Sequence, residues 1–251
     1  MSTLSCSRED AVKIITFNRP EKLNALSSEM RSELFAEMRN ANEDDSVRVV
    51  LLTGSGRGFC VGADLSSAAG DLKNELRESF HPLLREIRFG RKIFICAVSG
   101  VAAGAGLSLA VACDMRYCSP DARFVTAFHR IGLAPDTGLS FMLPRLIPAA
   151  AAFELLLRGG EFSAKQAVSW SLFSASDNPL SDALKAAHEI SAGPFLSFVK
   201  SKQLLNATLF TGMEQFLDIE AEVQGELGLT QDFAEGRAAF VEKRKAEFTG
   251  R

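Results

Sequence analysis

The sequence predicts an α/β fold, with strands and helices alternating through the first half of the chain. Two short β-branched runs, VKIITF at 12–17 and VRVVLLTG at 47–54, are typical of strands. The segment between them carries Met30, Leu34 and Met38 at four-residue spacing, as in a helix with one apolar face. We therefore expect a strand, a helix and a second strand in this order.

A third apolar run, IFICAV at 93–98, leads into another predicted helix, and short strands are expected at 114–118 and 123–126. None of these strands has a polar face, which is typical of sheets covered on both sides. After Pro135 the apolar spacing becomes helical. The sequence thus predicts an α/β first half followed by helices.

The chain is long enough to bury the core of one domain with an appendage. It has 251 residues, of which 47% are hydrophobic and 24% charged, and these values fit a globular protein. No repeat or low-complexity linker marks a sharp boundary. Pro and Gly interrupt the pattern around 180–195, so we predict a core over residues 1–190 and a helical region over 191–251.

Charge and cysteine usage restrict the possible partners. The net charge of -3 and the scattered Lys and Arg residues argue against a nucleic-acid partner. The five cysteines have no CxxC or Cys/His spacing, so we expect reduced thiols and no metal site. The N-terminal stretch has neither a basic leader nor an apolar run. We therefore expect residence in the cytoplasm.

One long uncharged segment allows a membrane-protein alternative. Between Lys92 and Asp114 lie 21 uncharged residues with a GxxxG spacing at Gly100 and Gly104, which is typical of packed transmembrane helices. The composition divides this segment, however, into a β-rich run, a Ser-Gly break and a helix-forming stretch without aromatic residues. We favour a buried strand followed by a buried helix.

Two glycine-rich turns each follow a predicted strand. TGSGRGFCVGADL follows the strand at 47–53 and SGVAAGAGLSL follows the strand at 93–98. Each could bring backbone N–H groups close to a ligand, although tight turns alone would also require glycine. Two such donors converging on one oxygen would stabilise an enolate or a tetrahedral oxyanion.

Several other catalytic motifs are missing from the sequence. Neither turn has the glycine spacing of a dinucleotide-binding loop, and no phosphate-binding GxxxxGK[ST] loop or GxSxG elbow occurs. His81, His129 and His188 have no identifiable Ser or Cys partner, so we interpret them as surface or loop residues.

A single acid, Asp136, lies in the segment AFHRIGLAPDTGLS at 127–140. Pro-Asp-Thr-Gly before LSFMLPRL is good chemistry for a helix N-cap, which is the structural alternative for this residue. The other nearby acid, Asp114, is expected to end a buried stretch and to pair with Arg116 or a backbone donor.

Five separated segments resemble one family. They are NRPEKLNALSSEM (18–30), GSGRGFCVGADL (54–65), VSGVAAGAGLSLAVACD (98–114), ARFVTAFHRIGLAPDTGLSFMLPRL (122–146) and FVEKRK (240–245). Together they resemble the crotonase, or enoyl-CoA hydratase/isomerase, superfamily. This resemblance implies a spiral of ββα units, a C-terminal helical region that packs between subunits, and homotrimers or dimers of trimers. It also implies an acyl-CoA thioester substrate, with no cofactor beyond the coenzyme A that the substrate carries and no metal.

The resemblance also implies a set of site residues. The oxyanion-binding N–H groups would be those of Ala63 and Ala105, and Asp136 would be the catalytic carboxylate. The residues expected to border coenzyme A or the acyl group are Arg19, Lys22, Leu23, Ala25, Asp64, Leu65, Gly104, Phe128, Leu133 and Lys243. For the charged members of this set, simple solvation is the structural alternative.

Departures from the family pattern favour one chemistry. Typical hydratases of the family have two glutamates, at the positions that here carry Ser108 and Phe128. Neither side chain can deprotonate water. Asp136 matches the position of the single acid in isomerase members, and apolar neighbours such as Leu133 and Leu139 should raise its pKa.

The segment LAPDTGLSFMLPRL most resembles enzymes that isomerise ring-epoxidised phenylacetyl-CoA. We therefore predict an acyl-CoA isomerase that shifts a double bond or rearranges an epoxide. An atypical enoyl-CoA hydratase is the alternative within the enzyme class. A catalytically silent acyl-CoA-binding protein is the alternative outside it.

Overall fold

The computed structural model describes residues 2–66 and 70–251. Within these residues the strands form a six-stranded sheet in the order β1-β2-β3-β5-β7-β10 and a four-stranded sheet in the order β4-β6-β8-β9. The strands are β1 (Leu4–Glu9), β2 (Val12–Phe17), β3 (Val49–Gly54), β4 (Gly58–Cys60), β5 (Ile93–Val98), β6 (Val101–Ala103), β7 (Met115–Cys118), β8 (Arg123–Val125), β9 (Glu161–Ser163) and β10 (Ser174–Ala175).

Helices follow the strands and dominate the C-terminal part. The α-helices are α1 (Ser28–Glu43), α2 (Leu72–Glu75), α3 (His81–Phe89), α4 (Ala105–Ala112), α5 (Leu139–Leu146), α6 (Ala149–Arg158), α7 (Ala164–Ser169), α8 (Pro179–Ala192), α9 (Phe195–Leu209), α10 (Met213–Leu227) and α11 (Gln231–Glu242). Short turns of other helix types are η1 (Pro20–Lys22), η2 (Leu76–Phe80) and η3 (Ala127–Ile131). The predicted α/β fold with C-terminal helices is confirmed.

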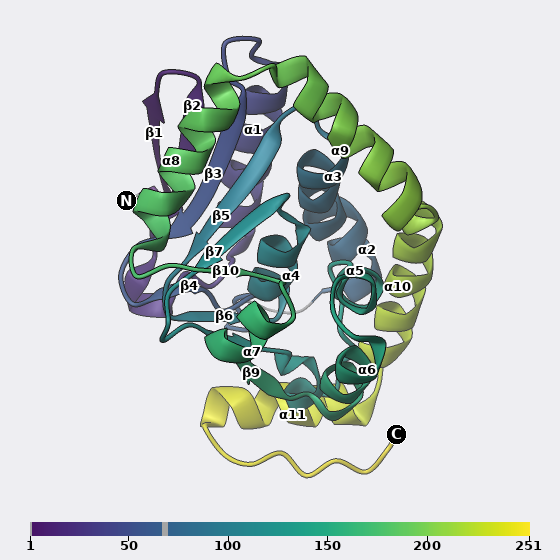
Figure 1. The fold of residues 1–251 in the computed structure, drawn as a ribbon. Coiled ribbons are helices and arrows are strands. Elements are labelled where there is room, and N and C mark those ends of the chain that lie inside the picture. Colours follow the sequence, from purple (N-terminus) through teal and green to yellow (C-terminus); the bar gives the residue numbers. More distant parts are fainter. Residues whose placement is uncertain (1, 67–69) are drawn as a thin grey trace.

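The larger sheet is buried on both faces. Its strands from β2 to β10 pair in parallel, and only β1 pairs antiparallel, with β2. Along β3, Val50 and Leu52 join the core that contains Met30 of α1, whereas Val49 and Leu51 join a second core beneath α8. Figure 1 shows α8 lying across one face of this sheet. The absence of a polar face in the sequence is explained by these two layers.

Each central strand of the larger sheet continues into a strand of the smaller one. β3 is followed by β4, β5 by β6, and β7 by β8, and β4, β6 and β8 pair in parallel. The long uncharged segment is therefore divided into β5, β6 and α4, and the short β6 was not predicted. No helix of the described residues has the length and apolar composition needed to cross a membrane.

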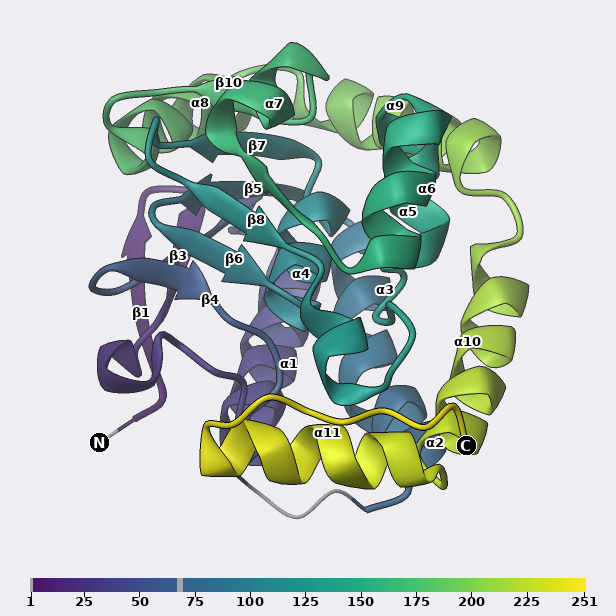
Figure 2. The same ribbon diagram turned by 90° about the horizontal axis from the view of Figure 1, so that it is seen from below.

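The last helices enclose the ends of both sheets. Figure 1 shows α9 and α10 following each other along one side, and Figure 2 shows α11 running beneath the smaller sheet. α11 packs closely on η3, since a Cβ built on Gly236 would lie 2.6 Å from Cα of Ile131. This arrangement brings the C-terminal helices against the loop that contains Asp136.

Candidate active site

The two glycine-rich turns lie against each other. Gly62, which follows β4, has a φ of 87°, and a Cβ built on it would lie 3.1 Å from the backbone nitrogen of Ala105. The approach at Gly106 is closer, since its Cβ would lie 2.3 Å from the carbonyl oxygen of Cys60. Glycine is required at both positions to allow this contact. The first turn of α4 therefore packs directly on the segment that carries Ala63.

The structure places both predicted backbone donors in these adjoining turns. Ala63 pairs with Leu26 in an isolated parallel bridge, in which Leu26 N–H donates to Gly62 O at 2.8 Å and Asp64 N–H donates to Leu26 O at 3.2 Å. In that pattern the N–H of Ala63 points away from Leu26. Ala105 begins α4, so its N–H has no acceptor within the helix. Their contact with a substrate oxygen stays a prediction.

Asp136 lies in the loop between η3 and α5, where it is half-buried. Thr137 donates its hydroxyl to Oδ1 at 2.8 Å, and Gln224 of α10 donates its amide to Oδ2 at 2.7 Å. The N-cap of α5 is Gly138, with a φ of 74° and no capping hydrogen bond from a side chain. The alternative that Asp136 serves as the N-cap of this helix is therefore wrong.

Ser108 and Phe128 connect the Asp136 loop to the glycine turns. The Ser108 hydroxyl lies 3.0 Å from the carbonyl oxygen of Asp136 and 3.3 Å from that of Gly104, and its single O–H can donate to either. The Phe128 ring faces the turn, because a Cβ built on Gly104 would lie 3.9 Å from Cζ. Leu133 N–H donates to the carbonyl oxygen of Phe128 at 3.2 Å. The two family glutamate positions are thus occupied by a buried hydroxyl and an apolar ring.

Burial makes the Asp136 carboxyl a weak acid. Desolvation, followed by the nearby Glu220 carboxyl, raises its pKa to about 7, although hydrogen bonds from Thr137 and Gln224 act in the opposite direction. The predicted direction of the pKa shift is therefore confirmed. The predicted apolar neighbours Leu133 and Leu139 are buried in the same core as Phe128, but the contribution of Glu220 was not foreseen.

A second acid and a histidine lie behind Asp136. Glu220 is 5% exposed and His81 is 1% exposed, and Nε2 of His81 lies 3.0 Å from Oε1 of Glu220. Burial raises the pKa of Glu220 to about 8, and burial with the neighbouring Arg85 lowers the pKa of His81 to about 4. The interpretation of His81 as a surface or loop residue is wrong, because it begins α3 and faces the core.

Sequence reasoning missed Glu220 and Gln224 for a physical reason. Both belong to the buried face of α10, together with Met213, Leu217 and Ala221. A polar side chain at a buried helical position is an unusual signal, because burying it without a partner is costly. This signal could have identified both residues, although it could not have named Asp136 as their neighbour.

Three of the predicted coenzyme A residues, Arg19, Ala25 and Asp64, are joined by hydrogen bonds. Arg19 donates to Asp64 at 2.9 Å and to the carbonyl oxygen of Ala25 at 2.6 Å. Partial burial favours the protonated form of Asp64, but hydrogen bonds from Ser66 and Arg19 outweigh it and lower the pKa of this carboxyl. The positive charge of Arg19 is thus already balanced in the free protein.

The remaining predicted coenzyme A residues differ in exposure. Lys22 and Lys243 are exposed, whereas Leu23 and Leu65 are half-buried. Leu23 has a φ of 49° and Lys243, at the end of α11, a φ of 55°, and both lie in the left-handed region. As coenzyme A contacts, these residues and Arg19, Ala25 and Asp64 stay predictions.

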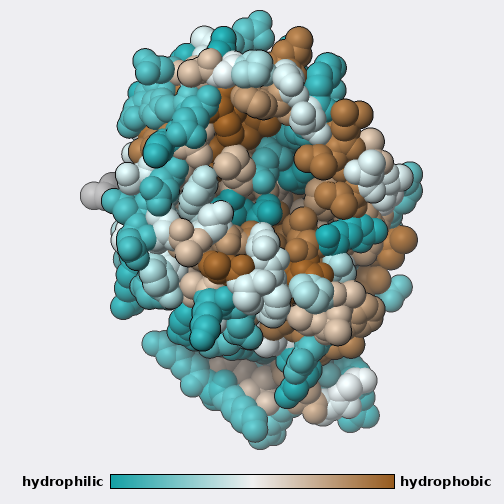
Figure 3. Space-filling model, in the orientation of Figure 1, coloured by the Kyte–Doolittle hydropathy of each residue, from teal (hydrophilic) through white to brown (hydrophobic). Residues whose placement is uncertain are grey.

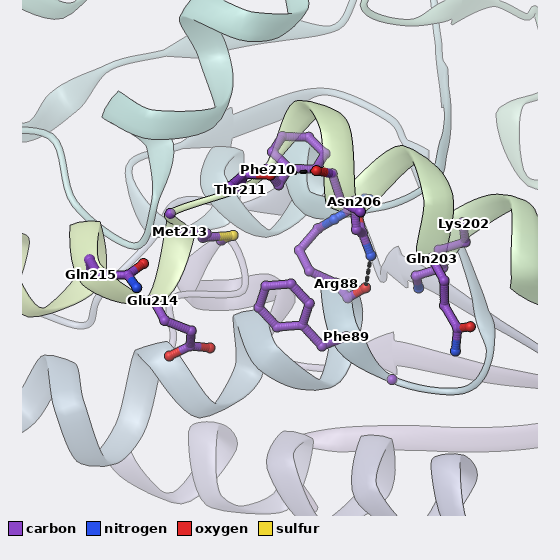
Figure 4. Close-up of a pocket in the computed structure, with 13 residues that line it drawn as sticks. Arg88, Phe89, Lys202, Gln203, Asn206, Phe210, Thr211, Met213, Glu214 and Gln215 are labelled. Atoms are coloured by element: carbon purple, nitrogen blue, oxygen red, sulfur yellow. Dashed lines mark hydrogen bonds between the residues drawn. The ribbon is translucent and has the colours of Figure 1, made fainter.

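A cavity of about 410 Å³ lies elsewhere, between the end of α3 and the junction of α9 and α10 (Figure 4). Its cations are balanced within the protein, since Arg88 and Lys202 donate to Asp114 at 3.1 and 2.8 Å. Asp114 also accepts from the backbone N–H of Phe94 at 2.8 Å, as expected for a backbone donor. The expected alternative pairing with Arg116 is not what the structure shows.

Comparison with known sequences identifies the family of this chain. A family model described as enoyl-CoA hydratase/isomerase matches residues 7–251. The chain is 38% identical to a 1,2-epoxyphenylacetyl-CoA isomerase of Escherichia coli, with 97% of each chain covered. It is 39% identical to a probable enoyl-CoA hydratase of Rhodobacter capsulatus, with 99% of this chain and 98% of that protein covered.

Solved structures agree at the level of the fold. A crystal structure of an enoyl-CoA hydratase from Mycobacterium avium subsp. paratuberculosis superposes with a TM-score of 0.90 at 32% identity, covering 98% of both chains. A protein described as an enoyl-CoA hydratase thus has a similar backbone fold. With its two glycine turns, its loop acid and its whole-length similarity, the chain belongs to the enoyl-CoA hydratase/isomerase family.

Proposed function

We propose that this enzyme is an acyl-CoA isomerase in which Asp136 carries the proton. The observation that supports this most is the setting of Asp136: a half-buried residue with a carboxyl pKa raised to about 7, in a loop that contacts the helix begun by Ala105 through Ser108. A general base works best when its pKa lies near the working pH. The positions of the family glutamates, occupied by Ser108 and Phe128, offer no second carboxylate.

The proposed reaction proceeds through an enolate. Asp136 removes a proton from a carbon atom made acidic by the thioester, while Ala63 N–H and Ala105 N–H hold the thioester oxygen as negative charge develops on it. One such donor contributes about 3 kcal/mol to lowering a barrier of this kind. The protonated Asp136 then returns the proton to a different carbon, so the substrate gains and loses no atoms. A positioned base of this type contributes about 10² to 10⁴ in rate.

The 1,2-epoxyphenylacetyl-CoA isomerase of Escherichia coli suggests a substrate class. We propose that the acyl group is either a ring epoxide of this type or a 3-enoyl chain, since both isomerise through an oxygen-stabilised intermediate at a thioester. A hydratase remains the second candidate, favoured by the name of the Rhodobacter capsulatus relative. Formation of 3-hydroxyacyl-CoA from a 2-enoyl-CoA would support it.

The experiment that tests the proposal is NMR of a 3-enoyl-CoA in deuterated water with wild-type protein and Asp136→Asn. We expect the double bond to migrate and deuterium to enter next to the thioester, and both to stop in the folded variant. If the wild type neither moves the double bond nor exchanges a proton, an epoxide substrate is tested next. Tight binding without turnover of either class would indicate the silent acyl-CoA-binding protein instead.

We further propose that the protein assembles as a homotrimer or a dimer of trimers. Large apolar side chains are exposed along α9 and α10, namely Leu196, Leu204, Leu205, Ile219 and Val223. Figure 3 shows hydrophobic side chains gathered on the side where Figure 1 places these helices. An exposed apolar surface of this kind is typical of a subunit interface. Light scattering at micromolar concentration tests this, and a monomer would contradict it.

A further inference from the structure

Helix α10 reaches the Asp136 loop through two side chains one helical turn apart. Glu220 accepts hydrogen bonds from the Gly138 N–H, at 3.1 and 3.0 Å to its two oxygens. Gln224, four residues later, donates to Asp136 at 2.7 Å and to the carbonyl oxygen of Ala134 at 3.1 Å. Residues at this spacing lie on the same helix face. One face of α10 therefore holds the loop on both sides of Asp136.

The orientation of the Gln224 amide follows from its second contact. The Ala134 carbonyl can only accept, so the nitrogen of the amide must face the loop, and its other N–H is directed at Asp136. Gln224 is 1% exposed, and its Oε1 has no hydrogen-bond partner among the residues that the structure describes. A buried acceptor without a partner is destabilising. The amide is thus kept in this orientation although its own oxygen is unsatisfied.

We infer that Gln224 is a positioning residue that holds and orients the Asp136 carboxylate by donating to Oδ2. This inference rests on the proposed function of Asp136 as the proton carrier. Thr137 donates to Oδ1, so each carboxylate oxygen has one fixed donor and retains one free lone pair. Two donors from different segments fix the plane of the carboxylate. A base held in this way meets the substrate carbon in one geometry, which is worth several orders of magnitude in effective concentration.

The charged groups around the Asp136 carboxyl also affect its pKa, so they must be considered when the Gln224 donor is removed. Glu220 disfavours the ionised form of Asp136, whereas His81 favours it only when its imidazole is protonated. The other charged groups near His81 are Arg85 of the same helix and Glu214 and Asp218 of α10. Gln224 is neutral and donates its amide N–H to Asp136, so this hydrogen bond favours the carboxylate over the acid. Removing the donor should raise the pKa of Asp136 further without changing the charge of any neighbour.

The test is a carboxyl titration by carbon-13 NMR on full-length protein labelled at the aspartate side chains. The Asp136 signal is identified by its loss in Asp136→Asn. In Gln224→Leu we expect the apparent pKa of Asp136 to rise by about one unit. Gln215→Leu, an exposed glutamine on the same helix, is the matched control and should leave the titration unchanged. An unchanged titration in folded Gln224→Leu overturns the inference.

A second variant keeps the test decisive if Gln224→Leu does not fold. Gln224→Asn retains the amide but shortens the side chain, so the donor can no longer reach Oδ2 at 2.7 Å. We expect the same upward shift of the Asp136 titration, smaller in size. If both variants fold, a titration identical to that of the wild type in both would show that the amide does not hold the carboxylate. If only Gln224→Asn folds, an unchanged titration in that variant would show the same.

Kinetics then separate this inference from the proposed function. With 3-enoyl-CoA as substrate, kcat of Gln224→Leu at pH 7 should fall about tenfold and KM change less than about twofold. The acid limb of the kcat/KM profile should move upward together with the NMR titration. If the titration moves but the acid limb does not, Gln224 positions Asp136 and the assignment of Asp136 as the proton carrier is wrong. If kcat falls without a shift in the titration, Gln224 acts in another way and the inference is wrong.

Discussion

Asp114 and Asp136 are two largely buried acids with opposite surroundings. Asp114 lies between two cations, Arg88 and Lys202, and its second oxygen also accepts from a backbone N–H. Among the described residues Asp136 has only neutral hydrogen-bond donors, and the charged group that affects its pKa most is a second acid, Glu220. A balanced buried charge holds the fold together, whereas an unbalanced one is kept where it serves chemistry. The two acids should therefore respond to the same substitution in different ways.

The largest expected effect is on turnover in Asp136→Asn. We expect kcat/KM for the isomerised thioester to fall about 10³-fold, or about 4 kcal/mol in barrier, because an amide cannot take up the proton. The unfolding free energy should stay equal or rise, since a buried group with an unfavourable charge is replaced by a neutral one. Steady-state kinetics and urea unfolding measure the two quantities. Asp121→Asn, at an exposed position, is the control, and equal loss of activity there would contradict the prediction.

Asp114→Asn should show the reverse pattern. It leaves Arg88 and Lys202 without a counter-charge in the interior, and removing one partner of a buried ion pair costs about 3 kcal/mol. Urea unfolding at fixed protein concentration should show this loss, while kcat of the remaining folded protein changes little. The double variant Asp114→Asn with Lys202→Met should recover part of the stability. A single variant as stable as the wild type would remove the basis of the comparison.

The strands of the fold were only partly predictable from the sequence. The β-branched runs predicted β2 and β5 at their observed bounds, because strands covered on both faces contain little else. The antiparallel edge strand β1, with the sequence LSCSRE, was missed since five of its six residues are exposed and its pattern is polar. A local run of apolar residues indicates a buried strand, and this edge strand is mostly exposed.

The candidate site was also only partly predictable from the sequence. Asp136 was identified because proline, glycine and a family resemblance mark its loop. Its neighbours Glu220 and Gln224 come from a helix more than eighty residues later: Glu220 bonds Gly138 across 82 residues, and Gln224 bonds Asp136 across 88. No local pattern can connect side chains that only tertiary packing brings together. For Asp114, sequence reasoning found the backbone donor but named the wrong cation for the same reason.

A smaller effect is expected in the pH dependence of stability. Asp136 and Glu220 have pKa values raised to about 7 and about 8, so between pH 6.5 and 8 the folded protein retains protons that the unfolded chain has released. The unfolding free energy therefore falls as pH rises through this window, by about 2 kcal/mol. His81 opposes this decline slightly at the lower edge of the window, because near pH 6.5 the unfolded imidazole is still partly protonated whereas the folded one, with its pKa lowered to about 4, is neutral.

Glu220→Gln should remove most of this decline, since the amide has no proton to lose. Thermal or urea unfolding across the window measures it. Glu226→Gln, an exposed acid on the same helix, should leave the decline unchanged. A wild-type stability that is flat from pH 6.5 to 8 would mean that the two acids are ionised like ordinary surface groups, and Asp136 would lose its distinction from Asp114.

The smallest effect is expected at Asp64, which lies between the two extremes. Its carboxylate is paired with Arg19 at 2.9 Å, and the Arg19 side chain is 19% exposed, against 6% for Arg88 and 4% for Lys202 beside Asp114. A pair with a solvent-exposed cation contributes less than about 1 kcal/mol. Asp64→Asn should therefore change the unfolding free energy by less than about 1 kcal/mol and leave the acid limb of the activity profile in place. Because the substitution removes the ion pair of Arg19, which is predicted to border coenzyme A, KM for acyl-CoA should change while KM for the shorter acyl-pantetheine stays constant. Equal changes for both thioesters would place Asp64 beside the acyl group instead. A loss of stability as large as that of Asp114→Asn would show that charge balance, more than burial of the partner, decides how much an acid contributes to the fold.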